Sequence, residues 1–166
     1  KYVVEFYLYY NQQANGLEYV SLRYANVYGP RQDPHGEAGV VAIFSQRLLG
    51  GDEAIIYGDG LQTRDFVYVG DVARANLLAK DAEIPPDVRP VFNIGTGQQT
   101  TVNEIFRLVR KYAGSPQKES HGPPRPGDVY HSYLANELAR IHIGWEPLTG
   151  IDEGLEKTVE YFRSLR

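Results

Sequence analysis

Two arginines, Arg64 and Arg125, have the chemistry and the setting to hold a diphosphate group. A guanidinium group binds phosphate oxygens through two parallel hydrogen bonds, a geometry that the ammonium group of lysine does not supply. Arg64 stands just before an expected strand, and Arg125 lies between two prolines in a loop far along the chain. If the two loops converge, their side chains can grip a diphosphate from both sides. The alternative is that each arginine forms a weak surface ion pair with a nearby aspartate, Asp65 in one loop and Asp128 in the other.

Asn26 is a third candidate, placed just after an expected strand over residues 18–24. Side chains at the carboxyl end of a strand lie at the edge of an α/β sheet where ligands bind. The amide of asparagine can donate a hydrogen bond to a phosphate oxygen without adding charge, although a turn-forming asparagine is the alternative interpretation. The four histidines have no spacing typical of metal ligands, so no metal site is expected.

The elements that would position these residues mix helices with strands. Apolar residues at helical spacing predict helices over residues 1–14, 40–49, 135–141 and 151–162, a helix after Thr101 and one capped by Asp71. Thr101 and Glu104 match a capping box. Strands are expected over residues 18–24, 54–57, 65–69 and 91–94, and loops over 31–38, 84–90 and 115–128. This mixture, without repeats, indicates an α/β or α+β fold.

Composition narrows the class of protein. The chain has 166 residues, 42% of them apolar, and a net charge of −4, which suits a globular domain and disfavours a nucleic-acid or anionic-membrane surface. No stretch has 18 consecutive apolar residues and the start does not resemble a signal peptide, so we expect no membrane partner and a cytoplasmic location. The absence of cysteine excludes disulfides, a thiolate nucleophile and zinc–thiolate sites. Methionine is also absent, even at position 1, so we expect a truncated or processed sequence.

A glycine-rich dinucleotide-binding pattern, Gly-x-Gly-x-x-Gly after a strand, does not occur in this sequence. Gly95-Thr96-Gly97 follows the strand expected over residues 91–94 and precedes a helix. Two glycines are a weak signal, and a tight turn before a capped helix is the favoured interpretation.

Four stretches, taken in order, resemble one enzyme family. They cover residues 1–5, 22–30, 57–69 and 125–128. Together they are similar to the NAD-dependent nucleotide-sugar epimerases and dehydratases of the extended short-chain dehydrogenase type, and most of all to the UDP-glucose 4-epimerases among them. The resemblance extends over nearly the whole chain but over only about the second half of a typical family member.

The resemblance implies an α/β fold with two parts. Residues 1–166 would form a C-terminal fragment, mostly the UDP-sugar-binding region. About residues 1–30 and 65–100 would contribute the last part of a doubly wound Rossmann-type domain, and the rest would form a small α/β substrate-binding domain. Such a fragment would leave a sheet edge and apolar faces uncovered, so we expect it to be swapped, partnered or poorly stable alone.

The resemblance also implies roles for individual residues. Lys1 matches the lysine of the family's Tyr-x-x-x-Lys pair, which lowers the pKa of the catalytic tyrosine and binds the cofactor ribose. That tyrosine has no counterpart here, and a solvated terminal lysine is the alternative. Tyr24 is implied on the nicotinamide side of the NAD pocket. The implied substrate-binding residues are Asn26, Arg64 and Arg125 at the phosphates, Tyr57 against the uracil ring, Asp128 at the uridine ribose, and Gly39 and Val40.

The stretch that contains Gly39 and Val40 departs from the family pattern. Some epimerases carry two neighbouring asparagines there, whereas this chain has Ala38, Gly39 and Val40. Backbone groups can take the place of the missing side chains. The departure leaves the identity of the sugar open.

For the whole protein, the resemblance implies transient oxidation of a UDP-sugar at C4 by NAD, followed by return of hydride to the other face. This chemistry needs a tight hold on UDP and a loose hold on the hexose. The resemblance further implies a homodimer through the N-terminal helix, with contact area from Tyr2, Phe6, Tyr9 and Tyr10. The chain alone, without the catalytic tyrosine, is expected to be inactive.

Three alternatives stay open at this point. The first is a sister enzyme, such as a UDP-glucuronate decarboxylase or a dTDP-glucose 4,6-dehydratase. The second is a non-catalytic UDP-sugar-binding module, favoured by the missing tyrosine and glycine-rich loop. The third is a structural dimerisation piece built on the N-terminal helix.

Overall fold

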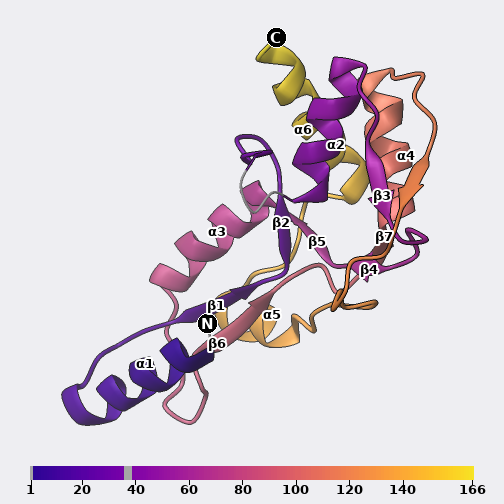
Figure 1. Cartoon of the computed structure of the whole chain (residues 1–166). Helices are drawn as coiled ribbons and strands as arrows, with labels where there is room; N and C mark the ends of the chain where they lie inside the picture. The colour runs from indigo at the N-terminus through magenta and orange to yellow at the C-terminus, as the bar shows by residue number, and fades with distance from the viewer. Residues whose placement is uncertain (1, 36–38) are drawn as a thin grey trace.

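The computed structural model describes residues 2–35 and 39–166. Helices and strands alternate along an elongated molecule, with the N-terminal helix near one end and the C-terminal helix at the other (Figure 1). The elements are α1 (Tyr2–Asn15), β1 (Ser21–Tyr24), β2 (Asn26–Tyr28), α2 (Val40–Gly50), β3 (Ile55–Tyr57), β4 (Thr63–Arg64), β5 (Phe66–Tyr68), α3 (Val69–Lys80), β6 (Val91–Ile94), β7 (Thr100–Thr101), α4 (Val102–Ala113), β8 (Ser120–Gly122), α5 (Glu137–Ile143) and α6 (Ile151–Ser164).

The extended segment that contains β1 and β2 changes its pairing partner at Ala25. β1 pairs in parallel with β6, and β2 pairs in parallel with β5. The Ala25 N–H still donates to the Ile94 carbonyl (2.9 Å), whereas the Asn26 N–H donates to the Asp65 carbonyl (2.8 Å). Asn26 therefore lies where one run of backbone passes from the first pair of strands to the second. The sequence missed β2 because a glycine and a proline follow it at once.

Four further short strands frame the region around residues 57–64. β3 pairs in parallel with β8, so that Tyr57 lies opposite Gly122, and β4 pairs antiparallel with β7, so that Arg64 lies opposite Thr100. β4, β7 and β8 were not predicted, because strands of two or three residues are too short to show an alternating pattern.

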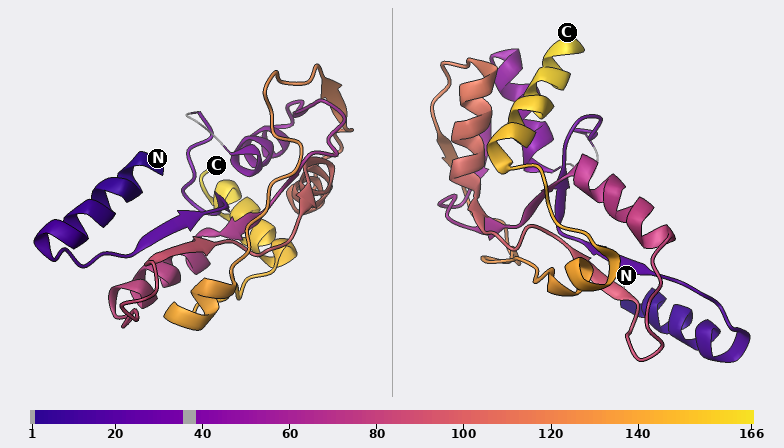
Figure 2. Two further views of the ribbon diagram at one scale, coloured as in Figure 1. Left: turned by 90° about the horizontal axis from the view of Figure 1, so that it is seen from below. Right: turned by 180° about the vertical axis from the view of Figure 1, so that it is seen from behind.

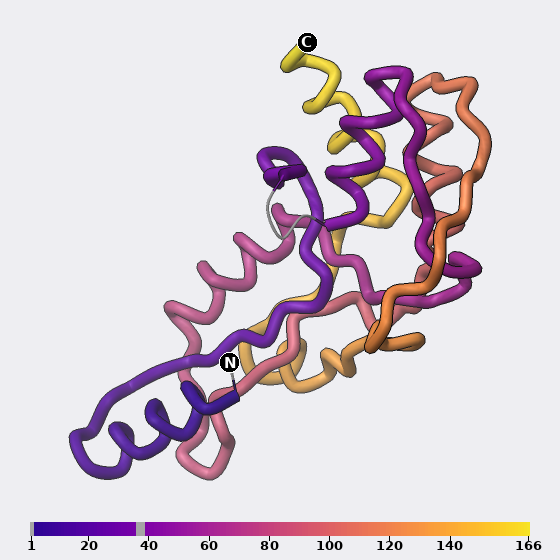
Figure 3. Tube along the Cα trace, in the orientation of Figure 1, coloured from indigo at the N-terminus to yellow at the C-terminus, as the bar shows by residue number. Residues whose placement is uncertain are grey.

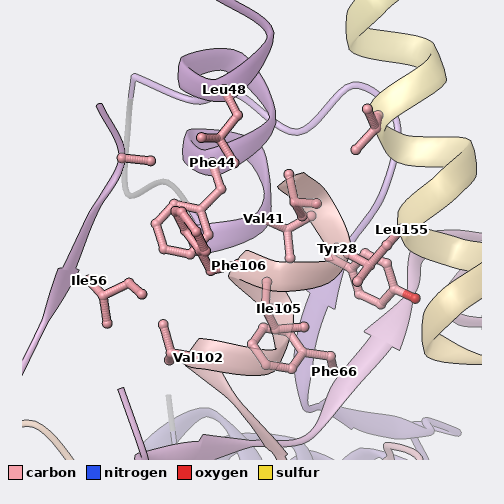
Figure 4. Close-up of a cluster of buried hydrophobic side chains, with 13 residues drawn as sticks. Tyr28, Val41, Phe44, Leu48, Ile56, Phe66, Val102, Ile105, Phe106 and Leu155 are labelled. Atoms are coloured by element: carbon pink, nitrogen blue, oxygen red, sulfur yellow. The ribbon is translucent and has the colours of Figure 1, made fainter. Parts of the chain in front are cut away.

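One apolar cluster lies between α2, α4 and α6, and the ends of β2 and β5 reach into it (Figure 4). Phe44 of α2 and Phe106 of α4 pack edge to face, with ring centres 5.5 Å apart. The helix boundaries follow the predicted signals: α2 ends at the left-handed Gly51, and the Thr101 hydroxyl accepts from the Glu104 N–H at the start of α4 (3.1 Å). The burial of this helical face fixes the β3–β4 region beside it.

A second apolar cluster lies under β1, β5 and β6 and is closed by α3, α5 and the buried Trp145. The prediction that Asp71 caps α3 is wrong. The helix begins at Val69, and Asp71 lies in its first turn. The Asp71 carboxylate accepts from the Thr149 N–H (2.9 Å), while its carbonyl accepts from the Trp145 indole (2.8 Å). Asp71 therefore ties the 145–149 segment to the helix instead of capping it.

α1 runs back along the chain beside β1 (Figures 2 and 3) and is fastened by a buried carboxylate. Glu5 accepts two hydrogen bonds of 2.7 Å from the Arg23 guanidinium, and an Arg89 nitrogen lies 3.3 Å from the same carboxylate. These hydrogen bonds from Arg23 hold the pKa of Glu5 below its usual value, against the opposing effect of burial. The apolar residues of α1 that remain exposed are Tyr2, Val3, Val4, Phe6, Tyr7, Tyr9 and Tyr10.

A groove of about 1420 Å³ separates one side of α1 from the loop over residues 82–90, with Phe6 and Tyr9 in its wall. None of the described helices is long and apolar enough to cross a membrane. The assignment of about residues 1–30 and 65–100 to a Rossmann-type part remains a prediction.

Candidate ligand-binding site

The structure brings four of the predicted site residues together where β3 and β4 meet the loop over residues 123–131. The Arg125 guanidinium lies over the Tyr57 ring, 4.1 Å from its centre. The Arg64 guanidinium donates to the Asp128 carboxylate. Arg125 and Asp128 share one tight turn, in which the Asp128 N–H donates to the Arg125 carbonyl (3.3 Å). The two loops therefore converge, and the two arginines lie in one small region.

The ion pairs that form are not those named as the alternative from the sequence. Arg64 pairs with Asp128, and in the described part of the chain neither Arg64–Asp65 nor Arg125–Asp128 is an ion pair. The Arg64 side chain is 17% exposed and also donates to the Thr63 carbonyl (2.8 Å), so it is held close to the protein surface. A phosphate group can replace a carboxylate as the acceptor of such a guanidinium group.

Asp65 is a buried residue whose part in the site was missed from the sequence. It is 1% exposed, and its carboxylate accepts from the Thr96 N–H (2.8 Å), the Thr96 hydroxyl (2.7 Å), the Gly97 N–H (3.0 Å) and the Leu134 N–H (3.3 Å). A carboxylate directly before a strand of apolar residues was the available signal, since a buried charge must find donors. Asp65 thus fixes the backbone on which Arg64 stands.

The same hydrogen bonds decide between the two interpretations of Gly95-Thr96-Gly97. The Thr96 and Gly97 N–H groups point to Asp65, as a tight turn requires. A side chain at Gly95 would come within 2.5 Å of the Asp65 carboxylate. This loop therefore forms a turn around a carboxylate of the protein and does not present those amides to a phosphate.

Asn26 and Tyr24 lie at the junction of the two pairs of strands. Asn26 is exposed, and its backbone bond to Asp65 places it next to the residue that follows Arg64. Tyr24 is 45% exposed at the end of β1, and its hydroxyl donates to the Asn76 side chain of α3 (2.9 Å). Asn26 is thus joined through its backbone to Asp65, whereas the Tyr24 side chain is tied to α3.

Gly39 and Val40 form the start of α2. Gly39 is extended and makes no side-chain cap, so the first N–H groups of the helix have no side-chain acceptor there. A Cβ at Gly39 would lie 2.6 Å from the Gln32 amide nitrogen, which donates to the Val27 carbonyl. Backbone N–H groups in the first turn of a helix suit an anion or a hydroxyl group. Lys1 and Ala38 lie outside the described residues.

Comparison with known proteins assigns the chain to a family. Residues 1–95 match the model of the NAD dependent epimerase/dehydratase family. The chain belongs to this family. Over 164 residues it is 44% identical to a putative UDP-glucose 4-epimerase of Methanocaldococcus jannaschii, an alignment that covers 99% of this chain and 52% of that protein. A more distant relative, 30% identical over 163 residues, is UDP-glucuronic acid decarboxylase 1 of Xenopus tropicalis, with 98% of this chain and 38% of that protein covered.

Solved structures of the family have the same fold. The crystal structure of UDP-glucose 4-epimerase with UDP-glucose from Thermotoga maritima superposes with a TM-score of 0.94 at 53% identity. The UDP-glucose 4-epimerase of Thermus thermophilus in complex with NAD gives 0.87 at 44% identity. Both alignments cover 99% of this chain and 52% of the other. The predicted α/β fold of the Rossmann type is confirmed, and the chain spans about half the length of these relatives.

No group of three or more histidine or carboxylate side chains gathers in a metal-binding arrangement within residues 2–35 and 39–166. The side chains that the structure brings together in the candidate site are two guanidinium groups, an aromatic ring and a carboxylate.

Proposed function

We propose that this chain is the UDP-sugar-binding portion of an NAD-dependent UDP-glucose/UDP-galactose 4-epimerase that works as a cytoplasmic homodimer. The observation that carries the proposal is the convergence of Arg64 and Arg125, with Tyr57 and Asp128 between them, on one small region. Two guanidinium groups beside an aromatic ring suit a diphosphate joined to a flat base. Because the chain belongs to the epimerase/dehydratase family, we propose a nucleotide sugar as the ligand.

In this proposal, UDP replaces contacts that side chains of the site make with one another. The diphosphate accepts hydrogen bonds from the guanidinium groups of Arg64 and Arg125. Asp128, released from Arg64, accepts hydrogen bonds from the ribose hydroxyls. The uracil ring stacks on Tyr57, a residue that is 39% exposed. Asn26 donates to a phosphate oxygen from the neighbouring strand end. Each exchange replaces one charged or aromatic contact with another, and the residues of the site are already neighbours before the ligand binds.

The hexose would meet fewer side chains than the nucleotide. Gly39 and Val40 offer backbone N–H groups at the start of α2, without side-chain amides. A loose hold suits an epimerase, because the sugar must present both of its faces to the reacting groups while UDP stays fixed. The same looseness leaves the choice between glucose, galactose and related sugars open.

In this proposal, the chain contributes residues to one side of the NAD site and does not form the whole site. When bound, NAD accepts and returns the hydride at C4 of the sugar. The exposed Tyr24 fits the nicotinamide side, and Lys1 is proposed to bind the cofactor ribose and to lower the pKa of the catalytic tyrosine. Since the Thr96 and Gly97 amides are taken by Asp65, this loop does not fit the cofactor phosphates. Residues outside this chain would hold that part of NAD.

The homodimer is proposed to form through α1. Its exposed aromatic residues, among them Phe6 and Tyr10, provide the contact area. Aromatic side chains are enriched in the cores of protein interfaces.

A decarboxylase of the same family is the second candidate, favoured by the 30% identity to UDP-glucuronic acid decarboxylase 1. The test is an assay of the whole protein that contains this chain, with UDP-glucose and UDP-glucuronate in parallel. Formation of UDP-galactose supports the epimerase. Release of carbon dioxide from UDP-glucuronate with no epimerisation would replace it by the decarboxylase. UDP binding with neither reaction and no bound NAD would make the protein a non-catalytic UDP-sugar-binding module.

A further inference from the structure

The loop over residues 123–131 carries both Arg125 and Asp128, and it is anchored at its two ends. At its start, the Gly58 N–H donates to the Gly122 carbonyl (3.0 Å). At its end, the Thr63 N–H donates to the Tyr130 carbonyl (2.8 Å). Both anchors lie on the β3–turn–β4 segment, so the loop spans the turn that follows Tyr57.

A side-chain hydrogen bond joins Tyr130, near the end of this loop, to Asp59 in the turn between β3 and β4. The Tyr130 hydroxyl donates to one Asp59 carboxylate oxygen (2.8 Å), and the Leu61 N–H donates to the other (2.9 Å). The Leu61 N–H and the Tyr130 hydroxyl lower the pKa of Asp59, and the bond to Asp59 raises the pKa of Tyr130. At neutral pH the carboxylate is therefore a charged acceptor and the phenol a donor.

The turn that carries Asp59 is itself braced by α4. The Asn103 side chain donates to the Asp59 carbonyl (3.0 Å), and the Asn103 N–H donates to the Gly60 carbonyl (3.0 Å). Gly60 has a positive φ of 72°, and a Cβ there would overlap the Asn103 side chain. Asp59 is thus a fixed point to which the loop can be tied.

We propose that Tyr130 and Asp59 are positioning residues for the nucleotide site. Their hydrogen bond holds the backbone of the loop, so that Arg125 and Asp128 stay beside Tyr57 and Arg64, where their side chains can turn to a nucleotide. Affinity then comes from a loop that is ordered before the ligand binds. This inference rests on the proposed function, because it concerns the binding of a nucleoside diphosphate at that site.

The test uses matched variants and UDP as the probe, titrated by calorimetry. Tyr130→Phe removes only the hydroxyl and Asp59→Ala removes the acceptor, and each is expected to weaken UDP binding about three- to tenfold, the range for one hydrogen bond. Asp59→Asn is expected to restore affinity to within about twofold, because an amide can keep both contacts. Tyr133→Phe is the control, since Tyr133 is 57% exposed and its hydroxyl has no hydrogen bond in the described part of the chain.

Two readouts separate positioning from a general loss of structure. In an Arg125→Ala background, Tyr130→Phe is expected to cost little further affinity, because the group that the loop positions is gone. In the chain without ligand, Tyr130→Phe is expected to speed hydrogen exchange within residues 123–131 and to leave exchange in α4 unchanged.

The outcomes are distinguishable. If the unaltered chain binds UDP and Tyr130→Phe binds it equally well, the positioning role is wrong and the proposed function stands. The same holds if the effects of Tyr130→Phe and Arg125→Ala simply add. If the unaltered chain does not bind UDP but Tyr130→Phe speeds exchange in the loop, the hydrogen bond orders the loop but the site is not the UDP site, which contradicts both proposals.

Discussion

The region around Tyr57 and Arg125 and the region around α1 are held in opposite ways. In the first, short strands, a turn and a loop are joined by many hydrogen bonds beside a closed apolar core. In the second, a helix with mostly exposed apolar side chains is fastened by the Glu5 carboxylate. Large exposed apolar surfaces are typical of faces that another domain or chain covers. The first region depends on hydrogen bonds over a buried core and the second on one charged contact, so we expect substitutions in the two regions to have separate effects.

The largest expected effect lies in the core beside the site. Phe106→Ala removes a fully buried ring that packs on Phe44, and it is expected to lower the free energy of unfolding by about 3–5 kcal/mol. The matched change in α1, Phe6→Ala, truncates a ring that is 54% exposed and should change it by less than about 1 kcal/mol. Urea unfolding of both variants measures the contrast. Equal losses would show that α1 is as well packed as the core.

A close contact between Tyr28 and α6 gives the next effect. A Cβ at Gly154 would overlap the Tyr28 hydroxyl, which is buried in the same cluster. Gly154→Ala is therefore expected to destabilise the fold by about 1–3 kcal/mol, although alanine favours helices. The double change with Tyr28→Phe, measured in the same urea series, should recover part of the loss. No recovery would mean that the hydroxyl is not the group that clashes.

Glu5 tests how the helical arm is fastened. Glu5→Gln leaves Arg23 without its charged acceptor and is expected to cost about 1–2 kcal/mol. Hydrogen exchange should rise in α1 and not in α4, since the contact is local. Glu160→Gln, the same change at an exposed glutamate of α6 that has no ion pair in the described part of the chain, is the control. Equal exchange in α1 before and after Glu5→Gln would contradict the account.

The same carboxylate predicts a dependence on pH. Because the hydrogen bonds from Arg23 lower the pKa of Glu5 in the folded chain, protonation opposes folding. The contribution of Glu5 is fully present above its ordinary pKa of 4.5 and is lost as the pH falls through the lower folded value. Thermal melts from pH 6 downward should show a loss of stability in the unaltered chain that is smaller in Glu5→Gln. Parallel curves would exclude this role for Glu5.

The smallest effect on folding, and a large one on assembly, is expected from Phe6→Ala combined with Tyr10→Ala. Both rings are more than half exposed, so the fold should survive, while a dimer through α1 should dissociate. Sedimentation of the whole protein measures the change. Leu77→Ala with Leu148→Ala, equally exposed apolar residues outside α1, is the control. A dimer that persists in the first variant and dissociates in the second would place the interface elsewhere.

The sequence predicted the parts of this fold whose signals are local and repeated. The helices α1, α2, α4 and α6 follow from apolar periodicity and from caps such as Gly51 and Thr101. β4, β7 and β8 were not predicted because they have only two or three residues each and form by pairing with segments that are distant in the sequence. Asp71 was misread as a cap because the groups that donate to it, the Trp145 indole and the Thr149 N–H, lie far along the chain, where no local pattern reveals them.

The candidate site divides in the same way. Arg64 and Arg125 could be chosen from residue type and family pattern. Only the structure could show that their two loops lie close together. The partner of Arg64 could not be chosen, because Asp65 is next in sequence but turns inward to Thr96 and Gly97. The hydrogen bond between Tyr130 and Asp59 depends on the path of a loop, so it could not be predicted from the sequence.

The central claim is that this chain alone forms the grip on UDP. The most direct measurement is calorimetric titration of the purified chain with UDP, beside Arg64→Ala and Arg125→Ala. We expect the unaltered chain to bind UDP and each variant to lose about 1.5–3 kcal/mol of binding free energy, the scale of a hydrogen bond to a charged group. Binding that is unchanged in both variants, or no binding by the unaltered chain, would contradict it.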